Sequence, residues 1–303
     1  MTEMLRLAHL SDPHLPGPLP RGAAWFGKRG LSAFNWLRRR RRLHRAEIAA
    51  AVAADLAAQA PDMVAMTGDL VNFGLAEEFA SARDWLARLG PPGRVIVTPG
   101  NHDALVGGWQ AGLAALGPHP GAEGMDRPRM RVAGGVALIA VSTAIPTPPL
   151  RATGRIGAAA RESLAALIRE ARTAGRLPVV LMHHPPTAIT ARRRRLIDGP
   201  ETCAVLAAAG AGLVLHGHTH RPDLSWIDGA AGRIPVLGVP SASIHAGAEI
   251  PGGWRLIALD RGARGWTATV TERAITPAGD LAPFAPFALP LPGPGPCGPR
   301  ASP

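Results

Sequence analysis

Residues 5–14 have the sequence LRLAHLSDPH, in which a short apolar run ends directly in Asp12 and His14. Short apolar runs of this kind predict buried strands. Four later apolar runs also end in polar side chains, at Gly68-Asp69, Gly100-Asn101-His102-Asp103, His183-His184 and Gly217-His218-Thr219-His220. Ligands of open α/β sheets bind at the carboxyl ends of the strands, so the pattern predicts one site built from several strand ends.

The spacing of apolar residues predicts an α/β sandwich of two mixed β-sheets flanked by helices. Helices are expected at 43–60, 76–89, 158–174 and 201–209. Strands are expected at 5–10, 63–67, 95–98, 129–132, 136–142, 179–183, 213–216, 235–239, 255–259 and 266–270. Several late strands follow one another without a helix, so the sheets should be mixed.

These elements define one domain over residues 1–275, with an insertion at 21–45 that is rich in aromatic residues and arginine. The Pro-rich segment 276–303 is predicted to be a disordered tail. No secretory signal is recognised at the start, and no apolar run reaches the ~18 residues of a membrane-spanning helix. Two cysteines are too few for a disulfide framework. We therefore expect a cytoplasmic protein.

The chain is strongly basic, with a net charge of +11 from 33 lysines and arginines against 22 acids. All but Lys28 of these cations are arginine. At 47% hydrophobic residues the 303-residue chain can bury a full core, which excludes a wholly disordered protein. The charge points to an anionic partner.

The strand-end residues form a donor set of carboxylate, amide and imidazole groups without thiolate. Such donors suit Mn, Fe or Zn. Seven converging groups are too many for one ion that keeps open positions, so we expect two divalent or transition metal ions. Two ions ~3.5–4 Å apart can share a hydroxide that attacks the phosphorus of a phosphate ester.

The ordered pattern D-x-H, G-D, G-N-H-D, H and G-H-x-H resembles the calcineurin-like metallophosphoesterase superfamily. Its spacing is similar to that of the class III cyclic nucleotide phosphodiesterase branch. The resemblance implies a bridging Asp69, with the first metal on Asp12, His14 and His220 and the second on Asn101, His183 and His218. It also implies that His102 gives a proton to the leaving oxygen. His184 is then expected beside the ligands or facing the substrate.

Two residues in or close to the motifs in the sequence, Asp103 and Asn72, can each be interpreted in two ways. Asp103 either orients His102 or caps the next helix. Asn72 stands where many relatives carry a carboxylate, and it either supports the metal ligands or caps a helix.

Two arginine clusters bear on the substrate. Arg38–Arg42 follow several aromatic residues of the insertion, which either packs on the domain or forms an interfacial element that meets anionic lipid. Either way the insertion should shape the entrance to the site. The second cluster is a solvated turn by default, although its position after a metal ligand would let it hold a substrate phosphate; it comprises Arg192, Arg193, Arg194 and Arg195.

We therefore expect a metal-dependent phosphodiesterase that acts on a small phosphate ester, with 3′,5′-cyclic nucleotide as the leading substrate. One alternative is a peripheral-membrane pyrophosphatase similar to UDP-2,3-diacylglucosamine hydrolases, although those enzymes commonly carry arginine where this chain has His102. Another is a non-catalytic basic scaffold or nucleic-acid binder. Loss of ligands is usual in such scaffolds, whereas every ligand of the pattern is present here. The oligomeric state is left open.

Overall fold

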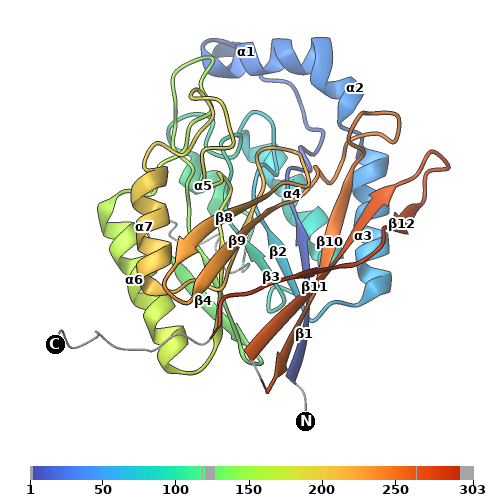
Figure 1. The fold of residues 1–303 in the computed structure, drawn as a ribbon. Helices are drawn as coiled ribbons and strands as arrows, with labels where there is room; N and C mark the ends of the chain where they lie inside the picture. The colour runs from blue at the N-terminus through green and yellow to red at the C-terminus, as the bar shows by residue number, and fades with distance from the viewer. Residues whose placement is uncertain (1–2, 118, 120–126, 264, 294–303) are drawn as a thin grey trace.

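Two β-sheets stack face to face, with helices on both outer faces, in the computed structural model of the chain (Figure 1), which describes residues 3–117, 119, 127–263 and 265–293. The first sheet has the order β12 (Leu281–Pro283), β11 (Gly265–Ile275), β10 (Gly253–Gly262), β1 (Glu3–Leu10), β2 (Met63–Met66) and β3 (Val95–Val97), and β13 (Phe287–Leu289) also pairs with β11. The second has the order β4 (Arg129–Ala133), β5 (Val136–Ala140), β6 (Leu177–Leu181), β7 (Leu213–His216), β9 (Gly232–Gly238) and β8 (Leu224–Gly229). The mixed α/β sandwich is confirmed.

Alternation of side chains along the strands builds three apolar layers. In β1, Leu7 points into the layer between the sheets, while Ala8 and Leu10 point outward. Helices α3 (Ala46–Gln59) and α4 (Ala76–Leu89) cover the outer face of the first sheet. Helices α6 (Ala158–Thr173) and α7 (Gly199–Ala209) cover the second.

Parallel pairing decides where the polar strand ends meet. Strands β1, β2 and β3 run parallel, as do β5, β6, β7 and β9. The two sheets also come together at this end, because the backbone N–H of His218 donates to Asp12 Oδ2 at 2.9 Å. The carboxyl ends of five strands from two sheets therefore enclose one site.

The insertion lies over this end of the sandwich (Figure 1). It contains the 3₁₀ turn Gly22–Trp25, α1 (Lys28–Asn35), the π-helical turn Trp36–Arg40 and α2 (Arg41–Leu43). The helix predicted from residue 43 begins only at Ala46, because His44 is extended and bridges to Ile244.

The Pro-rich segment corrects one prediction. Strands β12 and β13 lie within the region expected to be disordered, and both pair with β11. Leu289 is 2% exposed and completes the layer between the sheets. Proline is tolerated in edge strands. The proline content of the segment therefore predicted disorder wrongly, because pairing with β11 and burial of Leu289 hold residues 281–289 in place. Residues 294–303 lie outside the described residues.

Two further elements were not predicted, namely strand β8 and the short helix α5 (Trp109–Ala114). No helix in the part of the chain that the structure describes is long and apolar enough to cross a lipid bilayer.

Candidate metal centre and active site

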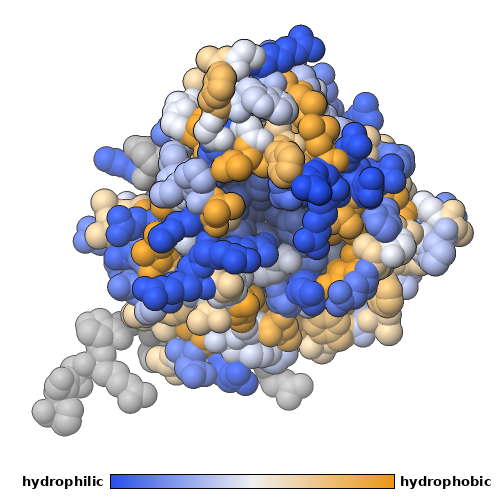
Figure 2. Space-filling view, turned by 90° about the horizontal axis from the view of Figure 1, so that it is seen from above, coloured by the Kyte–Doolittle hydropathy of each residue, from blue (hydrophilic) through white to orange (hydrophobic). Residues whose placement is uncertain are grey.

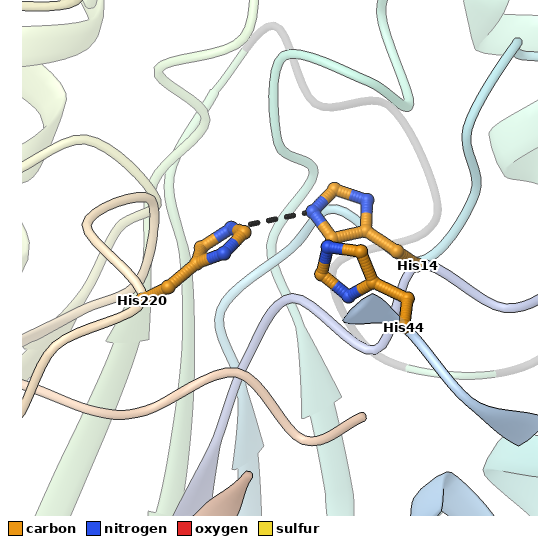
Figure 3. A group of neighbouring side chains, drawn as sticks. All are labelled: His14, His44 and His220. Atoms are coloured by element: carbon orange, nitrogen blue, oxygen red, sulfur yellow. Dashed lines mark hydrogen bonds between the residues drawn. The ribbon is translucent and has the colours of Figure 1, made fainter. Parts of the chain in front are cut away.

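The first group of predicted metal ligands comes together at the end of β1. His220 Nε2 lies 3.0 Å from Asp12 Oδ1 and 3.3 Å from His14 Nε2. His14 Nε2 is 3.7 Å from the same carboxylate oxygen. Figure 3 shows the rings of His14 and His220 turned toward each other, although 206 residues separate them in the sequence.

The second group lies where β3, β6 and β7 end. His183 Nε2 is 3.3 Å from Asn101 Oδ1, and the ring centroids of His183 and His218 are 5.1 Å apart. His183 Nδ1 donates to the carbonyl of Thr67 at 2.7 Å, and His218 Nε2 donates to the carbonyl of Arg194 at 2.8 Å. Such bonds fix the orientation of a ligand histidine and leave its other nitrogen facing the site.

Asp69 connects the two groups. Its Oδ2 lies 3.4 Å from His183 Nε2 and 3.7 Å from His14 Nε2, while Oδ1 accepts the backbone N–H of His102 at 2.7 Å. One carboxylate therefore faces both donor sets, as a bridging ligand must.

The ligand loops adopt unfavourable backbone conformations. Among the described residues seven non-glycine residues have positive φ, and five of these are predicted metal ligands: Asp12, His14, Asp69, His218 and His220. Strain of this kind persists only where the surroundings enforce it, and it concentrates at functional sites. Gly68 has a φ of +94°, and a Cβ there would lie 2.5 Å from the backbone nitrogen of Gly100. The G-D motif therefore needs glycine for close packing of two loops.

Asp103 serves neither predicted purpose. Its carboxylate accepts the backbone N–H groups of Asp69 and Gly100, both at 2.8 Å, and that of Val71 at 3.1 Å. It thus ties the loop after β2 to the loop after β3. Burial, and then the charge of Asp69, raise the pKa of Asp103.

Asn72 supports the ligands and caps no helix. Its amide donates to the carbonyls of His14 at 3.2 Å and Leu15 at 2.8 Å. The backbone carbonyl of Asn72 accepts Nδ1–H of His102 at 2.9 Å. Asn72 therefore stabilises the loop after β1 and also orients the ring of His102.

The charges of the site suit a bound cation. Burial lowers the pKa of His14 and His218 well below the usual value, so both rings stay neutral and offer a lone pair. Burial opposes charge on Asp69, yet His183 and His102 hold its pKa well below the usual range. Burial also opposes charge on His183, but the carboxylates of Asp69 and Asp12 raise its pKa to about 9. The centre favours positive charge between these groups.

His102 lines the pocket above the ligands. Because Nδ1 is held by Asn72, Nε2 is left for the pocket, where Arg40 contacts it at 2.5 Å. Burial, followed by the charge of Arg40, lowers the pKa of His102 to about 4.

The predicted substrate residues differ in whether they line the pocket. Both ring nitrogens of His184 contact protein groups, Thr143 Oγ1 at 2.8 Å and the carbonyl of Ala152 at 3.2 Å, so its role toward substrate stays a prediction. Arg194 lines the pocket and donates to the carbonyl of His218 at 2.8 Å. Exposed side chains at Arg192, Arg193 and Arg195 do not line it.

Two site residues were not singled out from the sequence. His44 is buried beside His14 and His220 (Figure 3), and its Nδ1 lies 2.8 Å from Ser243 Oγ. One ring nitrogen of each of these three histidines lies within 4.8 Å of the others, so His44 is a further potential ligand. Arg40 reaches His14 Nε2 at 2.6 Å. Neither residue follows a strand, and only the folding of the insertion brings them here.

Comparisons with known proteins identify the family of the chain. The calcineurin-like phosphoesterase family matches residues 5–222, and the chain belongs to that family. A Synechococcus sp. protein named "Probable cyclic nucleotide phosphodiesterase" is 31% identical over 218 residues, covering 70% of this chain and 77% of that protein. The chain is therefore a phosphoric ester hydrolase.

Two solved structures share the fold at low sequence identity. A dimetal phosphatase from Danio rerio has a TM-score of 0.62 at 12% identity and covers 94% of this chain and 98% of its own. A purple acid phosphatase from yellow lupin, Lupinus luteus, has a TM-score of 0.55 at 12% identity, covering 95% of this chain and 54% of its own.

The donor set fits metal ions. Buried carboxylate, amide and imidazole groups converge here with neighbouring donor atoms 3.0–3.7 Å apart, and His14 Nδ1 has no hydrogen-bond partner among the described residues. Packing so many acceptors in a buried space is costly unless a cation satisfies them.

Replacing Asp69 with alanine should remove bound metal, because both donor sets lose their shared carboxylate. After reconstitution with Mn or Zn, elemental analysis should find about two ions per chain in the wild type and few or none in Asp69→Ala. Asp84→Ala, which removes an exposed carboxylate, should keep the wild-type content. A wild-type protein that binds no metal would refute the assignment.

Proposed function

We propose that the protein is a dinuclear metal-dependent phosphodiesterase that cleaves a small phosphodiester such as a 3′,5′-cyclic nucleotide. The observation that carries this proposal is the position of Asp69, whose Oδ2 is 3.4 Å from His183 and 3.7 Å from His14. A carboxylate placed between two donor sets is the arrangement that binds a pair of ions.

When bound, two ions of Mn, Fe or Zn supply Lewis-acid polarisation of the phosphoryl group and an acidified water as nucleophile. The chain's own residues position the ester and deliver a proton. His102 is the proposed proton donor, from Nε2, to the leaving oxygen. The carbonyl of Asn72 fixes its ring, and an arriving phosphate anion next to it favours the protonated form.

The pocket favours a small ester. Its volume is about 350 Å³, at the lower end of the ~300–1,000 Å³ typical of ligand pockets. The similar Synechococcus protein carries a cyclic nucleotide phosphodiesterase name, which supports the same substrate class here. A polymeric nucleic acid would need an extended groove, so it ranks behind a small molecule.

A panel of esters tests the substrate. With Mn held constant, the protein should hydrolyse bis(p-nitrophenyl) phosphate and 3′,5′-cyclic AMP, with kcat/KM for the cyclic nucleotide at least about tenfold above that for glycerophosphodiesters, nucleotide-sugar lipids and single-stranded DNA. Asp69→Ala serves as the inactive control. A nucleotide-sugar lipid as the best substrate would overturn the cyclic nucleotide proposal.

The His102→Ala variant should separate metal binding from proton transfer. Bound metal should stay at the wild-type level, while kcat on a cyclic nucleotide falls by about 10²–10⁴. Bis(p-nitrophenyl) phosphate should lose much less, because its phenolate leaves without a proton. Full activity of the variant on the cyclic nucleotide would contradict the assignment.

A second proposal, peripheral contact with an anionic membrane, has support from one exposed surface. Phe26 and Phe34 of the insertion are 79% and 56% exposed, and the guanidinium of Arg38 lies over the Phe34 ring. Figure 2, which looks onto this side of the molecule, shows hydrophobic side chains among hydrophilic ones around a hollow. Phe26 precedes α1, Phe34 lies in α1 and Arg38 lies in the π-helical turn that follows. Apolar and cationic side chains that share one exposed helical segment are typical of interfacial elements. We propose a cytoplasmic enzyme that can dock on such a surface.

Vesicle flotation tests the docking proposal. The wild type should float with vesicles containing phosphatidylglycerol and less with pure phosphatidylcholine. Replacing both Phe26 and Phe34 with alanine should reduce binding by about a hundredfold or more, since each buried phenylalanine contributes roughly 1.5–3 kcal/mol. Phe284→Ala removes an equally exposed ring from the opposite end of the chain and should have no effect. Wild-type protein that never floats would exclude the membrane.

A further inference from the structure

One arginine of the insertion points into the metal centre. Arg40 Nη2 lies 2.6 Å from His14 Nε2, and its Nη1 lies 2.5 Å from His102 Nε2. The guanidinium therefore spans a predicted metal ligand and the proposed proton donor. A phosphate ester that contacts a metal ion held by His14 and takes a proton from His102 would occupy this same region.

The insertion is built to hold this side chain inward. Trp36, at the start of the π-helical turn, is buried and lies near His44, with 6.3 Å between ring centroids. At the other end the backbone N–H of His44 donates to the carbonyl of Arg40 at 2.8 Å. The extra residue of a π turn changes the direction of the side chains that follow it, and such turns are frequent at functional sites. Arg41 and Arg42, which come next, are exposed.

The guanidinium forms no direct ion pair with any described residue, although the charges of Asp69 and Asp12 stabilise it from a greater distance. Within the described residues no Asp or Glu oxygen lies within the 4 Å of an ion pair with Arg40. The pocket wall carries Arg39, Arg40 and Arg194 against the single carboxylate of Asp69. A largely buried arginine in a cationic pocket is costly unless an anion binds it.

The histidine contacts also limit what Arg40 can do. The lone pair of His14 Nε2 serves either the guanidinium or a metal ion. When that nitrogen binds metal, the planar N–H fork needs another acceptor, and the non-bridging oxygens of a phosphate ester match it bidentately.

We propose that Arg40 is a substrate-binding residue whose guanidinium holds the non-bridging oxygens of the phosphate ester over the metal ligands. The inference rests on the proposed phosphodiesterase function and extends it, since it assigns to the insertion a direct part in phosphate recognition.

Phosphate binding tests the inference without turnover. Isothermal titration of the Mn-loaded protein with inorganic phosphate should show a Kd about 10- to 100-fold weaker in Arg40→Gln, the loss expected for a charge-assisted bidentate contact. Arg40→Lys should fall between, because it keeps the charge and loses the fork. Arg42→Gln removes an exposed arginine of the same cluster and should bind phosphate as the wild type does.

Two further measurements separate the alternatives. Elemental analysis should find wild-type metal in Arg40→Gln, and KM for bis(p-nitrophenyl) phosphate should rise by a similar factor to the Kd. Unchanged Kd and KM would overturn the inference, as would loss of metal, which would make Arg40 a support of the ligands. Failure of the wild type on every diester would refute the proposed function, whereas the phosphate titration would still report on Arg40.

Discussion

The buried carboxylate of Asp69 places the strongest constraint on the molecule. A charge in such surroundings costs much free energy unless opposite charge or hydrogen bonds compensate it. Here the compensation comes from His183 and from the backbone N–H of His102, with His14 within 3.7 Å. These groups belong to different strand ends, so both sheets must close on the same point. The same balance of charge that keeps Asp69 ionised makes the centre attractive to metal ions.

Two other carboxylates stabilise the loops that position Asp69, by accepting backbone N–H groups. Asp103 accepts three backbone N–H groups from the loops after β2 and β3. Glu78, at the first turn of α4, accepts N–H groups of Asn72, Phe73 and Leu75. Backbone donors that strained loops would otherwise leave unpaired are thereby satisfied. The positive φ of Asp69 persists because these bonds leave its loop few alternatives.

The insertion supplies part of the wall of the pocket above the predicted metal ligands. It brings His44 beside His14 and His220, and it places Arg40 between His14 and His102. Part of the basic charge of the chain is therefore concentrated at the pocket through Arg39, Arg40 and Arg194. Attraction of a phosphate ester accounts for this local excess without a polymeric partner.

The sequence by itself determined the sandwich and the strand-end residues, since apolar periodicity and motif order are local properties of the chain. Helix α4 and strand β7 begin and end where they were predicted. Composition could not foresee β12 and β13, because pairing with β11 and burial of Leu289 decide that segment. Nor could it distinguish Arg40 from its four arginine neighbours or Arg194 from its three. Only the tertiary structure decides which of several identical side chains faces a buried charge, because that depends on contacts between residues far apart in the sequence.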